Sequence, residues 1–214
     1  MFKFIQFIFI AFIIFATSAF ASDLVAVPSS EARQWANSKG NQLLQAFSEK
    51  DVAVKYAKLD KMMEEDVNIK YIGKFVIGKY GKKMSKEQQS RYDDLFHRYI
   101  LSLYHKANFD FDTSSVHFTI DSVTEYPKFT NVSCTVDPGH LTDDVKFEKV
   151  PVKFKLIRGQ NNRIQAIDLD ISNVSMVIEY RKRFYQMIID EDENMDWFLE
   201  KFEDQVKANE DAAQ

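Results

Sequence analysis

Cysteine is almost absent from this chain of 214 residues, which contains Cys134 alone. A single cysteine excludes a disulfide within the chain, so the fold must depend on a hydrophobic core, which a chain of this length can bury. Cys134 alternates with Val132 and Val136, which is the spacing of one face of a β-strand. We therefore expect a buried apolar role for Cys134 and not a reactive thiol.

Long apolar runs are also scarce, since the chain has one near its start, from Phe7 to Phe15, and no second one. That run is shorter than the roughly 18–20 apolar residues that span a bilayer. Lys3 precedes it, and small residues ending in Ala19-Phe20-Ala21 follow it. These three parts are typical of a secretory signal peptide. We predict a cleaved signal peptide over residues 1–21, with a retained membrane anchor as the alternative.

A strong net charge is missing as well, because 28 lysines and arginines nearly balance 32 aspartates and glutamates, for a net charge of −4. Mild acidity argues against a nucleic-acid partner and against permanent adhesion to anionic lipid. The residues after the predicted signal peptide, 22–214, have the length of one domain. We therefore predict a single exported domain.

Recognisable catalytic motifs are absent too. The sequence has no G-x-S-x-G, H-E-x-x-H, C-x-x-C or glycine-rich phosphate loop. His97 and His105 are too far apart on one predicted helix for simple chelation of a metal. Asp168 and Asp170 share a strand face, where a catalytic carboxylate pair and two solvated carboxylates are both possible; we expect solvated ones. No cofactor or metal site is predicted.

What the sequence does contain is a helical first half. Helices are expected over residues of about 30–47, 51–65, 67–80 and 86–106. The strongest evidence concerns the last of these, because Ser85 and Gln88 form the S-x-x-Q pattern of a capping box. Large apolar side chains then follow at helical spacing on one face: Tyr92, Leu95, Phe96, Tyr99, Ile100 and Leu103.

From about residue 114 the apolar period changes from helical to two. Strands are expected around residues 116–120, 132–136, 152–156 and 167–171, and turn sequences such as Asp137-Pro138-Gly139 separate them. Consecutive strands of this kind form an antiparallel sheet with one apolar and one solvated face. Two closing helices are expected at about 174–189 and 194–208. The fold class predicted is α+β, with an antiparallel four-stranded sheet packed against a helical layer.

The chain also has a surplus of large apolar side chains, including 19 phenylalanines. They either fill a solid core or line a cavity for an apolar ligand between the sheet and the helices. A lipid carrier is feasible, because burying an acyl chain gains about 0.8 kcal/mol per CH₂. Its cavity would have to reach the upper part of the usual range of roughly 300–1,000 Å³.

Three segments together resemble the MlaC family of periplasmic phospholipid-binding proteins, also called the toluene-tolerance auxiliary or ABC transporter substrate-binding family. They are Val67–Tyr80, the Ser85-x-x-Gln88 helix with its aromatic stripe, and Val174–Met176 with the helix that follows. The resemblance covers residues of about 30–206. One departure is Asp190–Glu193, where the family often has a glycine between the last two helices.

The resemblance implies acyl chains held between sheet and helices, a lipid headgroup near solvent, and no enzymatic step. It implies a soluble phospholipid carrier in the periplasm that moves lipid between outer- and inner-membrane complexes and so maintains outer-membrane lipid asymmetry. The partners implied are an inner-membrane MCE-type ABC transporter complex and an outer-membrane lipoprotein–porin complex. A carrier of another apolar lipid such as hopanoid, and a small periplasmic enzyme on an α+β fold, are the alternatives.

Apolar face and family position together select the residues expected to bind the lipid. They are Tyr71, Phe75, Val76, Phe96, Tyr99, Leu103, Phe118, Phe154, Leu169, Ile171, Val174 and Met176. A separate group of lysines borders the aromatic segment of the third helix: Lys70, Lys74, Lys79, Lys82 and Lys83. These lysines form either a solvated helix face or a surface for docking on membrane complexes.

Overall fold

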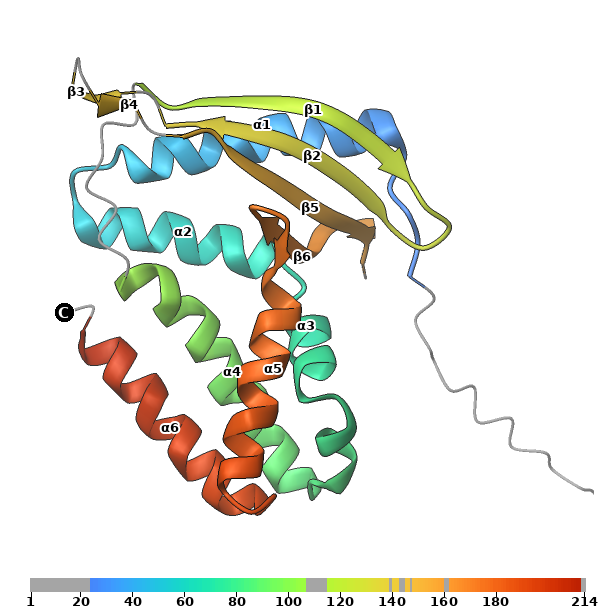
Figure 1. The fold of residues 1–214 in the computed structure, drawn as a ribbon, viewed down its shortest axis with the longest axis vertical. Coiled ribbons are helices and arrows are strands. Elements are labelled where there is room, and N and C mark those ends of the chain that lie inside the picture. Colours follow the sequence, from blue (N-terminus) through green and yellow to red (C-terminus); the bar gives the residue numbers. More distant parts are fainter. Residues whose placement is uncertain are drawn as a thin grey trace, which may run out of the picture.

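The computed structural model describes residues 24–106, 115–138, 140–142, 145–146, 148–159 and 162–212. The predicted signal peptide, 1–21, lies outside these residues. Figure 1 shows a curved antiparallel sheet with helices packed against it and a group of helices below it. The predicted α+β class is confirmed.

The main sheet has five strands in the order β1-β2-β5-β6-β7, one more than expected. Its strands are β1 (His117–Glu125), β2 (Thr130–Asp137), β5 (Val150–Arg158), β6 (Ile164–Ile171) and β7 (Val174–Ser175). All neighbouring strands are antiparallel. The additional strand, β7, is two residues long and occupies the place where the sequence suggested the start of a helix. A separate pair, β3 (His140–Thr142) and β4 (Val145–Lys146), extends between β2 and β5.

Six α-helices are described: α1 (Ser29–Phe47), α2 (Val52–Asp66), α3 (Ile69–Ile77), α4 (Lys86–Lys106), α5 (Met176–Asp190) and α6 (Met195–Asp211). A 3₁₀ helix, η1 (Gly78–Lys83), continues α3. The helix expected over 67–80 is therefore two elements. Gly78 causes the break, because its φ of +50° lies in the region that favours glycine.

Short polar side chains fix where most helices begin. Each accepts a hydrogen bond from a backbone N–H in the first turn of α2, α3, α4, α5 or α6, and they are Asp51, Asn68, Ser85, Ser175 and Asn194. Such caps satisfy N–H groups that have no partner inside the helix. The predicted capping box is confirmed, because Gln88 Oε1 also accepts from Ser85 N–H at 2.9 Å.

The hydrophobic core is divided into two clusters. One lies between α1 and the sheet and includes Val27, Ala36, Val132 and Leu156. The other lies among α3–α6 and contains most of the large aromatic side chains. Figure 1 shows these two layers, with α1 along the sheet and α3–α6 below it. Full burial of each large apolar side chain contributes about 1.5–3 kcal/mol, so both clusters stabilise the fold substantially.

Candidate functional site

The register of the sheet places a continuous row of apolar side chains on one face. Val132 lies opposite Phe154, which lies opposite Leu169 on the next strand. Residues directly opposite each other point to the same face of a sheet. On the other face, the Lys153 ammonium lies 2.5 Å from the Asp170 carboxylate. One face is therefore apolar, and the other carries ion pairs.

Helix α1 covers the β1–β2 half of the apolar face. The ring of Phe118 lies so close to Gly40 that a Cβ there would be 2.9 Å from it. Trp35 packs edge-on against Phe154, with ring centroids 6.1 Å apart. The cover ends two residues beyond Leu169 on β6, where Ile171, opposite Val152, is 38% exposed.

Helix α1 itself carries an accessible apolar side chain on its buried side. Ala36 and Ala46 are each 1% exposed, whereas Leu43 is 37% exposed. Leu43 is seven residues after Ala36 and three before Ala46, and both spacings keep it on the same side of the helix. A large apolar side chain thus remains accessible on the side of α1 that carries the buried alanines.

The aromatic stripe of α4 divides into a buried part and an accessible end. Phe96 and Tyr99 are 1% and 3% exposed, and Phe96 packs against Gly73 of α3. Leu103, one turn beyond Tyr99, is half-buried at the edge of the same cluster. Tyr180 of α5 closes this end, with its ring 6.1 Å from that of Tyr99.

The twelve residues predicted to bind lipid do not share one pocket in this structure. Three are buried in the helical cluster: Val76, Phe96 and Tyr99. Phe118 and Phe154 belong to the cluster under α1. Four are half-buried, namely Tyr71, Leu103, Leu169 and Met176. Three are exposed, namely Phe75, Ile171 and Val174. Their contact with lipid stays a prediction, and for the buried ones it requires the helices to separate.

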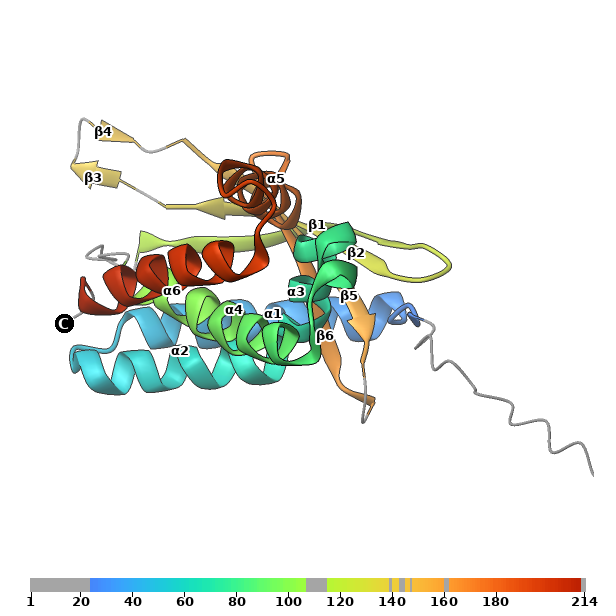
Figure 2. The ribbon, with the colours of Figure 1, turned by 90° about the horizontal axis from the view of Figure 1, so that it is seen from below.

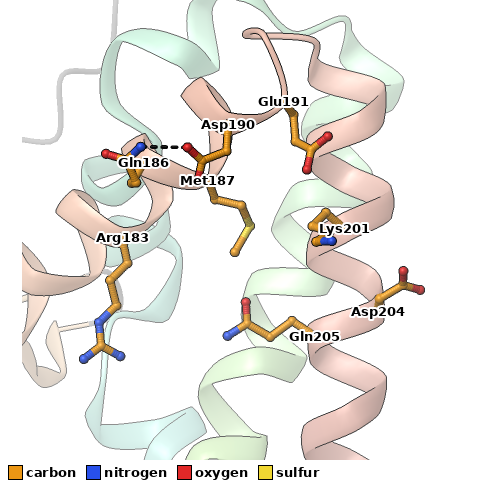
Figure 3. A pocket seen from close by; sticks show the side chains of 8 residues that line it. All are labelled: Arg183, Gln186, Met187, Asp190, Glu191, Lys201, Asp204 and Gln205. Atoms are coloured by element: carbon orange, nitrogen blue, oxygen red, sulfur yellow. Dashed lines mark hydrogen bonds between the residues drawn. The ribbon is translucent and has the colours of Figure 1, made fainter.

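Two hollows open elsewhere on the surface. Figure 3 shows the larger, of about 700 Å³, between α5 and α6. Charged and polar side chains line it, including Arg183, Asp190 and Lys201, and a hydrogen bond joins Gln186 to Asp190. None of the predicted lipid-binding residues lies there. Met187 also lies in the wall, and the aliphatic parts of the long side chains leave much of the lining apolar.

The smaller hollow, of about 350 Å³, lies where α1 and the end of α2 meet β6. The Lys39 ammonium lies 2.7 Å from the Asp66 carboxylate there. Burial nevertheless raises the pKa of Asp66, because the unfavourable desolvation of the ionised carboxylate exceeds the stabilisation that Lys39 gives it. Trp35 forms part of the wall, so this hollow borders the sheet–α1 cluster.

The polar groups considered as catalytic candidates have structural partners. Asp168 is 7% exposed and accepts hydrogen bonds from the Ser175 hydroxyl and the Val177 N–H, so the expectation of a solvated carboxylate is wrong for Asp168. Its position at the start of α5 complements the helix dipole. His105 lies 2.8 Å from Asp60. Within the described ranges, no group of three or more histidine, cysteine or acidic residues could hold a metal ion.

Sequence reasoning missed Leu43 and Tyr180 as accessible apolar residues. The helical spacing could have indicated both, since Leu43 lies on the same side of α1 as the buried alanines and Tyr180 lies one turn after Met176 on α5. Nothing in the sequence, however, shows which positions on a buried side remain uncovered.

In the part of the chain that the structure describes, no helix is both long and apolar enough to cross a membrane.

A sequence model of the MlaC family, described as MlaC protein, matches residues 39–204. Among solved structures, the chain is similar to a phospholipid-binding protein from Ralstonia solanacearum, determined in complex with a phospholipid at 1.53 Å resolution. The two share 13% sequence identity and a TM-score of 0.61, over 88% of this chain and 100% of the other. At that identity the similarity shows a common fold. No curated protein matches the chain.

Proposed function

This chain belongs to the MlaC family, and on that basis we propose that it binds a phospholipid as a carrier and has no catalytic step. The proposed binding site is the apolar side of the sheet beyond α1, together with the inner sides of α1 and α4. The similar protein from Ralstonia solanacearum was determined with a phospholipid bound, which supports the choice of ligand.

One structural observation carries this proposal: apolar side chains on the buried sides of three elements remain accessible. Leu43 on α1, Leu103 on α4 and Ile171 on β6 are exposed or half-buried, although their helical or strand spacing places them with buried neighbours. A filled core would cover such side chains, because protein interiors pack as densely as organic crystals. An acyl chain would cover them in the loaded protein.

We further propose that the chain works in the periplasm after removal of residues 1–21. There it would exchange lipid with an inner-membrane MCE-type ABC transporter complex and an outer-membrane lipoprotein–porin complex, and so maintain outer-membrane lipid asymmetry. The predicted signal peptide and the family support this role. A cleaved protein should begin at Ser22 or within a residue or two of it by N-terminal sequencing.

Native mass spectrometry of the protein purified from membrane-containing cells tests lipid binding. The expected spectrum shows the cleaved chain with one phospholipid attached, and fragmentation identifies the lipid. A hopanoid in place of the phospholipid would keep the carrier and change its cargo. An empty chain that also takes up no lipid from vesicles would contradict the proposal.

A further inference from the structure

The seam between α3 and α5 exposes several large apolar side chains. Phe75 on α3 is 36% exposed, and Ile178 and Ile189 on α5 are 47% and 51% exposed. Ile178 and Ile189 are eleven residues apart, which places them on one side of α5. Helices α3 and α5 lie side by side in Figures 1 and 2. Together these side chains form a stripe, which we call the α3–α5 surface.

An arginine is fixed in the middle of this surface. The Arg181 guanidinium lies over the Phe75 ring, 4.9 Å from its centroid, and donates a hydrogen bond of 2.9 Å to the Tyr185 hydroxyl. Gly78 makes room for it, because a Cβ there would be 2.9 Å from the guanidinium. No carboxylate pairs with Arg181 among the described residues. Its charge is thus held in place and not neutralised.

Lysines extend the positive charge on the α3 side of the surface. The Lys79 ammonium lies 4.8 Å from the centroid of the Tyr80 ring. Lys70 and Lys74 are exposed on α3 itself. None of these three lysines pairs with a carboxylate in the described ranges, whereas neighbouring Lys83 pairs with Glu193. The cations therefore gather at the end of the surface near Phe75, whereas Ile189 at the other end is followed by the acidic run 190–193.

We propose that the α3–α5 surface docks transiently on the anionic phospholipid surface of a bilayer. Phe75, with Arg181 over its ring and lysines on the same helix, matches the boundary between headgroups and acyl chains, where the cations contact phosphates. An acidic protein partner could form ion pairs with the cations, but it would offer no apolar surface to cover Ile178 and Ile189. The inference rests on the proposed carrier function, because a carrier gains from an approach to the membrane that supplies its lipid.

The acidic balance of the whole chain keeps this docking weak. Repulsion between the anionic membrane and the rest of the protein opposes adhesion, so attraction is confined to one side. Binding should therefore decrease steeply with salt, because exposed charges are screened beyond about 8–10 Å at physiological ionic strength.

Vesicle flotation of the exported protein tests the proposal. The protein is mixed with vesicles of phosphatidylcholine alone, or of phosphatidylcholine with phosphatidylglycerol, at low and at physiological salt. We expect flotation with the anionic vesicles at low salt only. The variant Lys74→Gln/Lys79→Gln should bind about 25-fold more weakly, since each cation near the surface contributes about five-fold. Ile178→Ser should weaken binding without changing its dependence on salt.

The matched controls are Lys50→Gln/Lys61→Gln and Val54→Ser, which alter exposed residues at and beside α2. They should float like the wild type. The proposal would be overturned if the wild type did not float with anionic vesicles at low salt. It would also be overturned if the variants and the controls lost vesicle binding to the same extent. Variants that bind vesicles normally but exchange lipid slowly with a membrane complex would overturn it as well, because the surface would then serve a protein partner.

Native mass spectrometry of the same samples separates this inference from the carrier function. A protein that holds phospholipid but does not float with anionic vesicles contradicts membrane docking alone. A protein that carries no lipid contradicts the carrier function, whatever its flotation.

Discussion

At the scale of single residues, accessibility distinguishes the side chains that can meet a ligand from those that only fill the core. Tyr99 and Leu103 follow each other by one turn on α4, yet Tyr99 is 3% exposed and Leu103 is half-buried. The sequence predicts that both lie on the apolar side of the helix. It cannot predict their exposure, because that depends on where the neighbouring helices stop covering α4.

Leu103→Asp tests whether this position lines the lipid site. An unpaired carboxylate facing acyl chains is costly to desolvate, so we expect bound phospholipid to fall at least ten-fold. Lipid is measured by native mass spectrometry, and circular dichroism verifies the fold. Val54→Asp, at an exposed apolar position of α2, is the control and should retain its lipid. A folded Leu103→Asp protein with its full lipid load would show that Leu103 does not line the site.

Cys134 offers a second test at this scale. The residue is 1% exposed, as the strand pattern predicts, and burial raises the pKa of its thiol to about 12. Because the thiolate is the reactive form, the native protein at pH 8 should react with a disulfide reagent at least 100-fold more slowly than the protein in urea. Equal rates in the two states would contradict the placement of Cys134 under α1.

Asp168 shows that strand spacing predicts the face on which a residue lies but not whether that face is covered. Alternation correctly assigns it to the polar face, and solvent is the usual neighbour of such a residue. The chain instead turns back through β7, so that the start of α5 covers the carboxylate and uses it as a cap. That return depends on a two-residue strand, which is too short to produce a detectable period.

At the scale of elements, ion pairs that the sequence does not reveal join α4 and α6 beside their buried aromatic contacts. Arg91 and Arg98 on α4 contact Glu203 and Glu210 on α6, at 2.6 and 2.7 Å. The helices themselves were predictable, because capping residues and helical spacing are local features. Partners more than one hundred residues apart are not local, and only the packed structure brings them together.

Acid titration tests the ion pairs of Glu203, one to Lys207 on α6 itself and one to Arg91 on α4. Lys207 and Arg91 lower the pKa of Glu203 from an ordinary 4.5 to about 2. A lowered pKa means that ionised Glu203 stabilises the fold above pH 4.5, and that this contribution disappears as the pH falls towards 2. Glu203→Gln should therefore have a lower Tm than the wild type at pH 6, with a difference that shrinks at pH 3.

The effect should be small, because the pairs are exposed and solvent screens them. Glu200→Gln, an exposed position on the same helix, should leave the Tm unchanged at both pH values. A difference between Glu203→Gln and wild type that grows on acidification would refute a stabilising role for the ion pairs of Glu203.

At the scale of the whole molecule, the division into two clusters limits what the sequence predicts. The apolar faces of the helices and of the sheet are both readable from their periods, and so is the α+β class. How these faces pack together is not readable from the sequence, because α1 covers β1 and β2 while α3–α6 pack mainly on one another. The predicted lipid site therefore spreads over two clusters and the accessible side chains between them.

In the proposed loaded protein, acyl chains lie along the apolar side of the sheet, between α1 and α4. Photocrosslinking with a phospholipid that carries a diazirine in one acyl chain tests it most directly, with labelled peptides mapped by mass spectrometry. We expect labels at Leu43, Leu103 and Leu169 or at their immediate neighbours. Labels confined to the hollow between α5 and α6, or no labels from a protein that retains the lipid, would contradict it.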